Sequence, residues 1–99
     1  MAAATRLVTI TNRKGLHARP AAKFVKTAEQ YNAQVSVRRL DVEDGDETQA
    51  PVGGTSILGI MMLAAEPGAK LELSADGEEA EAALAALTDL IERKFDEDE

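Results

Sequence analysis

Apolar residues recur along this chain with two periods, and these periods predict alternating strands and helices. Over residues 5–11, 34–40 and 70–75 they recur at every second position, a pattern typical of strands with one buried face. Residues 48–52 predict a weaker strand. Because proline donates no ladder hydrogen bond, Pro51 should make that strand short, place it at an edge of the sheet or end it.

The first predicted helix covers residues 18–31, where apolar residues are three and four positions apart. Pro20 fits the first turn of a helix, where its missing N–H would have no intrahelical partner, so the helix should begin near His17. The apolar face of this helix consists of Ala21, Phe24, Val25, Ala28 and Tyr31.

Two further helices are expected nearer the C-terminus. Residues 56–65 predict a short and very apolar helix, with Thr55 or Ser56 as its N-cap. The last helix has Asp76 at the cap position and Glu79 three residues later, which resembles a capping box. The apolar face of the last helix consists of Ala80, Ala83, Leu84, Leu87, Leu90 and Ile91.

The predicted elements follow the order β-α-β-β-α-β-α, which indicates an α+β fold. Strands with one apolar face need a cover, and helices on one face of an antiparallel sheet would supply it. From its length we expect a single domain over residues 1–99, with residues 1–4 and 96–99 frayed and residues 41–49 forming an extended acidic loop. That loop fits a calcium site poorly, because its glycine is misplaced relative to the acids and no helices flank it.

Composition excludes several classes of chemistry. The chain has no cysteine, which removes disulfides, thiolate catalysis and zinc–thiolate sites, and its single histidine rules out a His-rich metal centre. We therefore expect neither a metal nor a cofactor. No window is long and apolar enough for a signal peptide or a membrane span, so we expect a cytoplasmic protein without membrane insertion.

The net charge of −7 conceals a strong asymmetry along the sequence. Residues 1–39 carry eight basic residues and one acidic residue, whereas residues 40–99 carry three basic and 17 acidic residues. This distribution fits either ordinary solvated faces or one basic working face. We expect no nucleic-acid binding, because the only aromatic residues are Phe24, Tyr31 and Phe95 and they form no stacking platform.

The strongest candidate for chemistry is the only histidine, His17, at the start of the helix predicted over residues 18–31. A lone histidine there is compatible with a plain surface or capping role. The positive end of a helix also favours a bound anion, which the amides of Ala18 and Arg19 could contact. The Arg19 guanidinium adds a bidentate phosphate ligand, so the segment is suited to binding phosphate.

Residues 15–20, with Ala21, Ala22 and Phe24 after them, resemble the active-site signature of the histidine-containing phosphocarrier proteins, the HPr family. Residues 54–64 resemble this family's regulatory-serine segment and stand at the correct place in the order of elements. The resemblance implies an open-faced β-sandwich, in which three helices cover one face of a four-stranded antiparallel sheet.

The same resemblance implies a phosphoryl carrier of the phosphoenolpyruvate-dependent phosphotransferase system rather than an enzyme. His17 would accept a phosphoryl group through Nδ1 from enzyme I and pass it to an enzyme IIA domain. Arg19 and the backbone N–H of Ala18 would stabilise the phosphate. The alternative is a regulatory interaction module, as in the nitrogen-related branch of the family, which signals through phosphorylation-dependent binding to a regulatory protein.

Ser56 has two compatible interpretations, a helix cap and a regulatory phosphosite. The second follows from the resemblance, because an HPr kinase/phosphorylase modifies the matching serine in many relatives, although Thr55 stands where many of them carry a basic residue. The resemblance also implies a monomer with a partner-docking surface, whose apolar members are equally typical of core positions. The expected members of this surface are Lys14, Ala22, Lys23, Lys26, Ile57, Leu58 and Met61.

Overall fold

The computed structural model describes residues 3–11, 17–40, 52–63 and 67–96. Within these residues four strands form one antiparallel sheet in the order β1-β4-β2-β3. The strands are β1 (Ala3–Thr9), β2 (Gln34–Arg39), β3 (Val52–Gly53) and β4 (Lys70–Asp76). The helices are α1 (Ala18–Ala28), α2 (Ile57–Met62) and α3 (Ala80–Glu92), followed by the 3₁₀ turn η2 (Lys94–Asp96).

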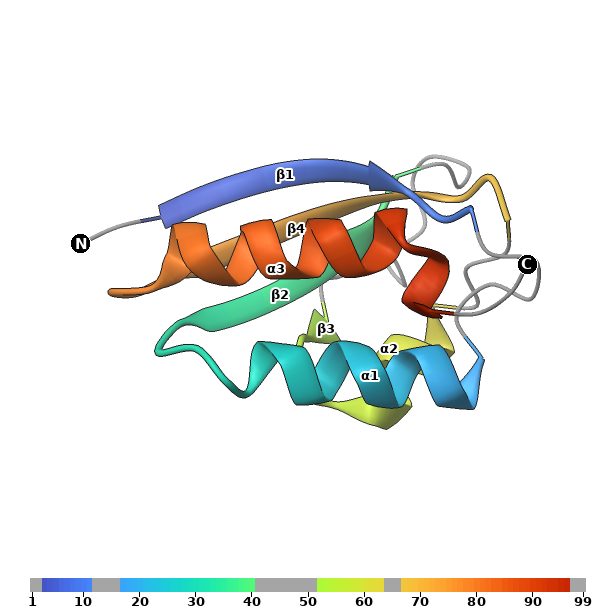
Figure 1. Ribbon diagram of the computed structural model, residues 1–99, viewed down its shortest axis with the longest axis horizontal. Helices are drawn as coiled ribbons and strands as arrows, with labels where there is room; N and C mark the ends of the chain where they lie inside the picture. The colour runs from blue at the N-terminus through green and yellow to red at the C-terminus, as the bar shows by residue number, and fades with distance from the viewer. Residues whose placement is uncertain (1–2, 12–16, 41–51, 64–66, 97–99) are drawn as a thin grey trace.

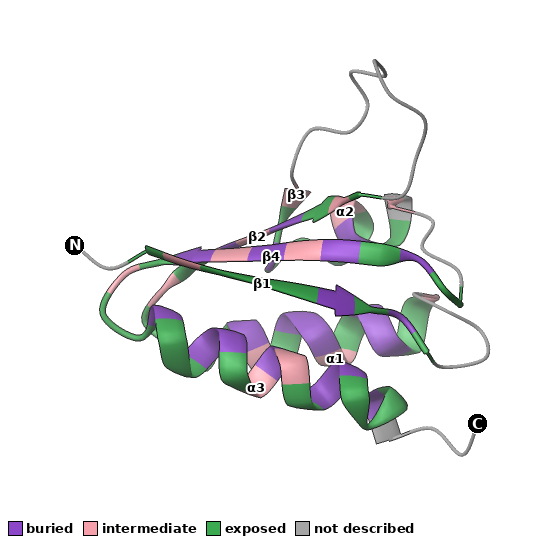
Figure 2. Cartoon of the chain, turned by 90° about the horizontal axis from the view of Figure 1, so that it is seen from above, coloured by how far each residue is buried: buried purple, intermediate pink, exposed green. Residues whose placement is uncertain are grey.

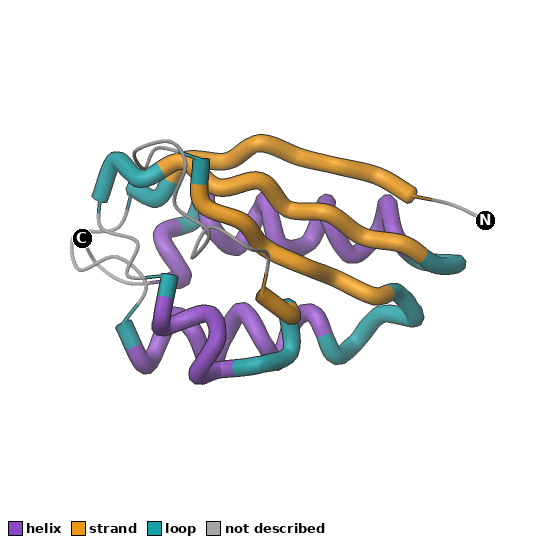
Figure 3. Tube along the Cα trace, turned by 180° about the vertical axis from the view of Figure 1, so that it is seen from behind, coloured by secondary structure: helices purple, strands orange, loops and turns teal. Residues whose placement is uncertain are grey.

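Two of the helices cover one face of the sheet. Helices α1 and α3 lie on the same side of the strands (Figures 1 and 2), and from the opposite direction the strands lie in front of α3 (Figure 3). Helix α3 packs on β1 and β4, whereas α2 packs beside α1 and β3. The predicted α+β class and the four-stranded antiparallel sheet are therefore confirmed. No helix of the described residues is long and apolar enough to cross a membrane.

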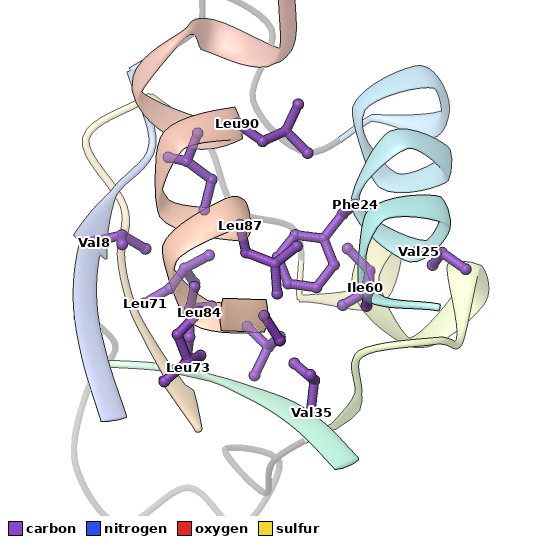
Figure 4. Close-up of a cluster of buried hydrophobic side chains, with 14 of the residues drawn as sticks. Val8, Phe24, Val25, Val35, Ile60, Leu71, Leu73, Leu84, Leu87 and Leu90 are labelled. Carbon is purple, nitrogen blue, oxygen red and sulfur yellow. The ribbon is translucent and has the colours of Figure 1, made fainter. Parts of the chain in front are cut away.

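A single buried cluster joins the helices to the sheet. Phe24 of α1 is 1% exposed, and its ring points between Leu87 of α3 and Ile60 of α2 (Figure 4). All six residues predicted for the apolar face of the last helix are buried. The sheet adds the buried side chains Val8, Val35, Val37, Leu71, Leu73 and Ala75.

The first strand begins earlier than the sequence pattern suggests. Ala3 and Ala4, which we expected to be frayed, pair with Asp76 and Ala75 of β4 and so belong to β1. The weaker strand is present as the short edge strand β3, but it spans Val52–Gly53 and shares only Val52 with the predicted range, most of which lies outside the described residues. The acidic loop over residues 41–49 lies outside the described residues.

The predicted start of the last helix was wrong. Asp76 is the last residue of β4, where it pairs with Ala3 and Gln34, so it cannot also be the N-cap of α3. The N-cap is Glu79, whose carboxylate makes no capping bond and instead accepts a hydrogen bond from the Asn32 N–H at 2.6 Å. The Glu79 carboxylate, which the sequence pattern assigns to a capping box, therefore links the start of α3 to the loop that contains Asn32.

Gly77 connects β4 to α3 in a conformation that side chains rarely adopt, with a φ of +138°. A Cβ at this position would lie 2.9 Å from both the Asn32 carbonyl oxygen and the Ala33 Cα. We expect Gly77→Ala to lower the free energy of unfolding by about 3 kcal/mol, measured by urea denaturation, because backbone strain and steric overlap add.

Gly68 provides the matched control for this measurement. It also has a positive φ, +93°, but a Cβ there would meet no atom within 4 Å. Gly68→Ala should therefore cost only about 1 kcal/mol, from backbone strain alone. Equal losses in the two variants would contradict the close approach at Gly77.

Candidate functional site

His17 is the N-cap residue of α1. Its backbone is extended, with φ of −83° and ψ of −169°, and its carbonyl oxygen accepts the first helical hydrogen bond from the Ala21 N–H at 3.0 Å. The half-buried imidazole makes no capping hydrogen bond to the helix. The sequence-based expectation of a helix beginning next to His17 is confirmed, and the residue stands at the positive end of the α1 dipole.

The first turn of α1 offers donors to an anion. The backbone N–H groups of Ala18 and Arg19 have no acceptor within the helix, because the first N–H groups of any α-helix lie beyond its hydrogen-bond ladder. Both residues are exposed, whereas Pro20 after them is buried and fixes the turn in place. Two amides and a guanidinium therefore lie within two residues of the imidazole in the sequence.

Ser56 is the N-cap residue of α2. Its Oγ accepts a hydrogen bond from the Gly59 N–H at 3.0 Å, so the capping interpretation is confirmed, while the residue itself is exposed. The Gly54 N–H donates to the carbonyl oxygen of Val35 at 2.7 Å, which anchors this segment to β2. Because α2 packs against α1, the helix that begins at Ser56 is a neighbour of the helix that begins at His17.

Side chains of α1 and α2 meet in an open pocket of about 420 Å³. Three apolar side chains of α2 remain in solvent, with exposed fractions of 44% for Ile57, 68% for Leu58 and 36% for Met61. Of the docking residues expected from the sequence, Ala22, Lys23, Lys26 and Ile57 line this pocket, together with Arg19, Val25 and Glu29. Leu58 and Met61 are exposed on α2, and Lys14 lies outside the described residues. We call this the α1/α2 surface, and it comprises Arg19, Ala22, Lys23, Lys26, Ile57, Leu58 and Met61.

Lys23 differs from Lys26, the other described lysine that we expected to contact partners. Its Nζ donates a part-buried hydrogen bond to the carbonyl oxygen of Phe95 at 2.6 Å. Phe95 is fully buried although it stands next to the end that we expected to be frayed. Nothing in the sequence pattern indicates this contact, because it joins residues 72 positions apart through a backbone oxygen.

Most basic residues described within residues 1–39 are bound to acceptors inside the protein. Arg19 and Lys26 are exposed, and no ion pair of the described residues involves them. Among the described residues, Arg19 and Lys26 are thus the basic residues of this part of the chain for which no internal acceptor is found. The bound residues are Arg6 with Glu81 at 3.1 Å, Lys23 with Phe95 O at 2.6 Å, Arg38 with Glu72 at 2.8 Å, and Arg39 with Leu63 O at 3.2 Å.

The position of His17 at the start of α1, next to the helix amides and Arg19, suits an anionic group bound to the imidazole at the protein surface. Helix amides and a guanidinium stabilise negative charge, and a shallow surface leaves the group accessible to another protein. Across the residues that the structure describes, no three His, Asp or Glu side chains gather to hold a metal ion. The residues that we take as the candidate site are His17, Arg19 and the first amides of α1.

Comparison with known proteins assigns this arrangement to a family. The family described as PTS HPr component phosphorylation site matches residues 4–93 of the chain. The phosphocarrier protein HPr of Pseudomonas aeruginosa is 47% identical over 92 residues, which cover 93% of this chain and 94% of that protein. The multiphosphoryl transfer protein of Salmonella typhimurium is 38% identical over 82 residues, which cover 83% of this chain and 20% of that protein.

A solved structure leads to the same assignment. The crystal structure of HPr-C-His from Thermoanaerobacter tengcongensis matches with a TM-score of 0.79 and 42% identity, and the match covers 100% of both chains. These relatives are phosphocarriers, and they do not favour the regulatory-module alternative. The chain therefore belongs to the HPr family of phosphocarriers in the phosphoenolpyruvate-dependent phosphotransferase system.

Proposed function

We propose that His17 is the phosphoacceptor, that enzyme I is the donor and that an enzyme IIA domain is the acceptor of the phosphoryl group. The observation that carries this proposal is the position of His17 as N-cap of α1, directly before the exposed Arg19. An imidazole at this place is accessible to another protein, and the charge of the transferred group falls at a positive helix end.

The transfer requires little from this chain beyond position and charge stabilisation. The Nδ1 lone pair of His17 attacks phosphorus while the bond from phosphorus to the donor atom of enzyme I breaks. Attack through Nδ1 requires the ring proton on Nε2, so no proton has to move in this step. The Ala18 N–H and the Arg19 guanidinium then bind the phosphoryl oxygens.

The α1/α2 surface is the docking surface in this proposal. It combines the exposed apolar side chains of Ile57, Leu58 and Met61 with the cations of Arg19 and Lys26, a composition that suits adaptable binding to several acidic partners. We expect a monomer to be the working form, as the resemblance to the family implies. We also expect a cytoplasmic carrier, with no turnover of its own.

Ser56 is the proposed regulatory phosphosite, with an HPr kinase/phosphorylase as the modifying enzyme and a regulatory protein as a further partner. Phosphate on Ser56 would add a charge of about −1.5 to −2 beside the exposed Ile57. That charge would repel an acidic partner from the α1/α2 surface. The fold itself should remain unchanged, because the serine is exposed and stands outside the core.

The phosphoacceptor is tested by incubating the protein with enzyme I and labelled phosphoenolpyruvate. The wild-type protein should gain one acid-labile phosphoryl group, because phosphohistidine hydrolyses in acid, and His17→Ala should gain none. Arg19→Met should still be labelled, but more slowly, because one charge-assisted contact to the phosphate is lost. Persistent labelling of His17→Ala would overturn the assignment.

The docking surface is tested with two exposed leucines. Leu58 on α2 and Leu7 on β1 are 68% and 70% exposed, but Leu7 lies on the face of the sheet away from the helices. Leu58→Asp should raise the dissociation constant for enzyme I at least about tenfold, measured by isothermal titration calorimetry. Leu7→Asp should leave it unchanged, and equal effects would refute a surface confined to α1 and α2.

The two roles of Ser56 separate in two variants. Ser56→Ala should lower the free energy of unfolding by about 1 kcal/mol, because it removes the acceptor for the Gly59 N–H. Ser56→Asp should preserve stability, since aspartate is an equally good cap, but should weaken binding to enzyme I. Unchanged binding by Ser56→Asp would argue against control through docking.

A further inference from the structure

The ammonium group of Lys23 is held in a specific contact inside the protein. Its hydrogen bond to the Phe95 carbonyl oxygen measures 2.6 Å and is part-buried. Hydrogen bonds with a charged donor are shorter and stronger than those between neutral groups. Lys26, three residues later on the same helix, is exposed. The two lysines of the α1/α2 surface therefore differ in their surroundings.

The acceptor of this hydrogen bond is itself fixed. Lys94 and Phe95 both adopt left-handed backbone angles, with φ of 58° and 57°, which residues other than glycine rarely do. Such a conformation persists only where its surroundings stabilise it. The fully buried Phe95 side chain and the Lys23 ammonium supply that stabilisation. The η2 turn thus packs on α3 with Phe95 in the core.

We propose that Lys23 is a positioning residue, which fixes α1 to the η2 turn and thereby holds His17 and Arg19 in place for phosphoryl transfer. The inference rests on the proposed role of His17. The buried face of α1 is apolar, and apolar contacts are not directional, so they permit small shifts of the helix. The hydrogen bond has a defined length and direction, and phosphoryl transfer is sensitive to shifts of an ångström or less.

The contact also separates two cations. Arg19 and Lys23 are four residues apart on α1, so they lie on the same face of the helix, and both line the same pocket. Like charges at this spacing repel each other. Because the Phe95 carbonyl oxygen holds the Lys23 ammonium, Arg19 is the cation of this pair that a phosphoryl group on His17 would meet.

The test compares Lys23→Met with Lys26→Met, a control that removes the same charge three residues later. The kcat and KM of enzyme I are measured at steady state with each variant as the protein that accepts the phosphoryl group. Lys23→Met should lower kcat about tenfold with little change in KM, because α1 is less well positioned. Lys26→Met should raise KM and leave kcat unchanged, because it weakens docking only. Lys23→Arg keeps a charged donor and should restore part of kcat.

A spectroscopic measurement makes the test independent of activity. In ¹H–¹⁵N NMR spectra of the lysine side chains, the Lys23 ammonium should exchange its protons with water more slowly than the Lys26 ammonium. If Lys23→Met raises KM as Lys26→Met does and leaves kcat unchanged, Lys23 is a docking charge and the inference is wrong. A lower melting temperature with unchanged kinetics would show a purely structural contact and overturn it equally. Failure of the wild-type protein to accept a phosphoryl group would instead refute the proposed function, and the inference with it.

Discussion

The burial of Phe24 is the interaction on which the rest of the arrangement depends. Its ring is 1% exposed and points between Leu87 of α3 and Ile60 of α2, so one side chain of α1 joins all three helices (Figure 4). Helix α2, which begins at Ser56, packs beside α1, which begins at His17. A core contact with no chemistry of its own thus holds together the two helices that carry these polar residues.

The fold was predictable from the sequence where the signal is local and periodic. The apolar faces of α1 and α3 follow from residue spacing. The start of α3 was not predictable in this way, because Asp76 has the composition of a cap but is occupied by sheet pairing on both sides. Long-range pairing overrides a local preference here, and the sequence contains no marker for it.

The candidate site shows the same division. His17, Arg19 and Ser56 are recognisable because each stands at a helix start, where residue type and position are linked. The role of Lys23 is not recognisable, since its partner is the carbonyl oxygen of Phe95 rather than a side chain. A backbone oxygen is present at every residue, so its position in space becomes known only from the structure. The docking role of the α1/α2 surface stays a prediction, and the structure adds that Lys23, one of its expected cations, is bound to a backbone oxygen.

Basic side chains that pair with acceptors of the same chain change the charge that a partner protein meets. Arg6 and Arg38 are paired with acids of α3 and β4, and Arg39 holds a carbonyl oxygen next to α2. The net charge of −7 and the basic first third are therefore both poor guides to the docking surface. In its described part, the proposed α1/α2 surface has two exposed cations, Arg19 and Lys26, and three exposed apolar side chains. A small surface of this kind favours fast exchange over tight binding. A carrier that must leave one partner before it meets the next needs this balance, because a larger charged surface would prolong each complex and slow the relay.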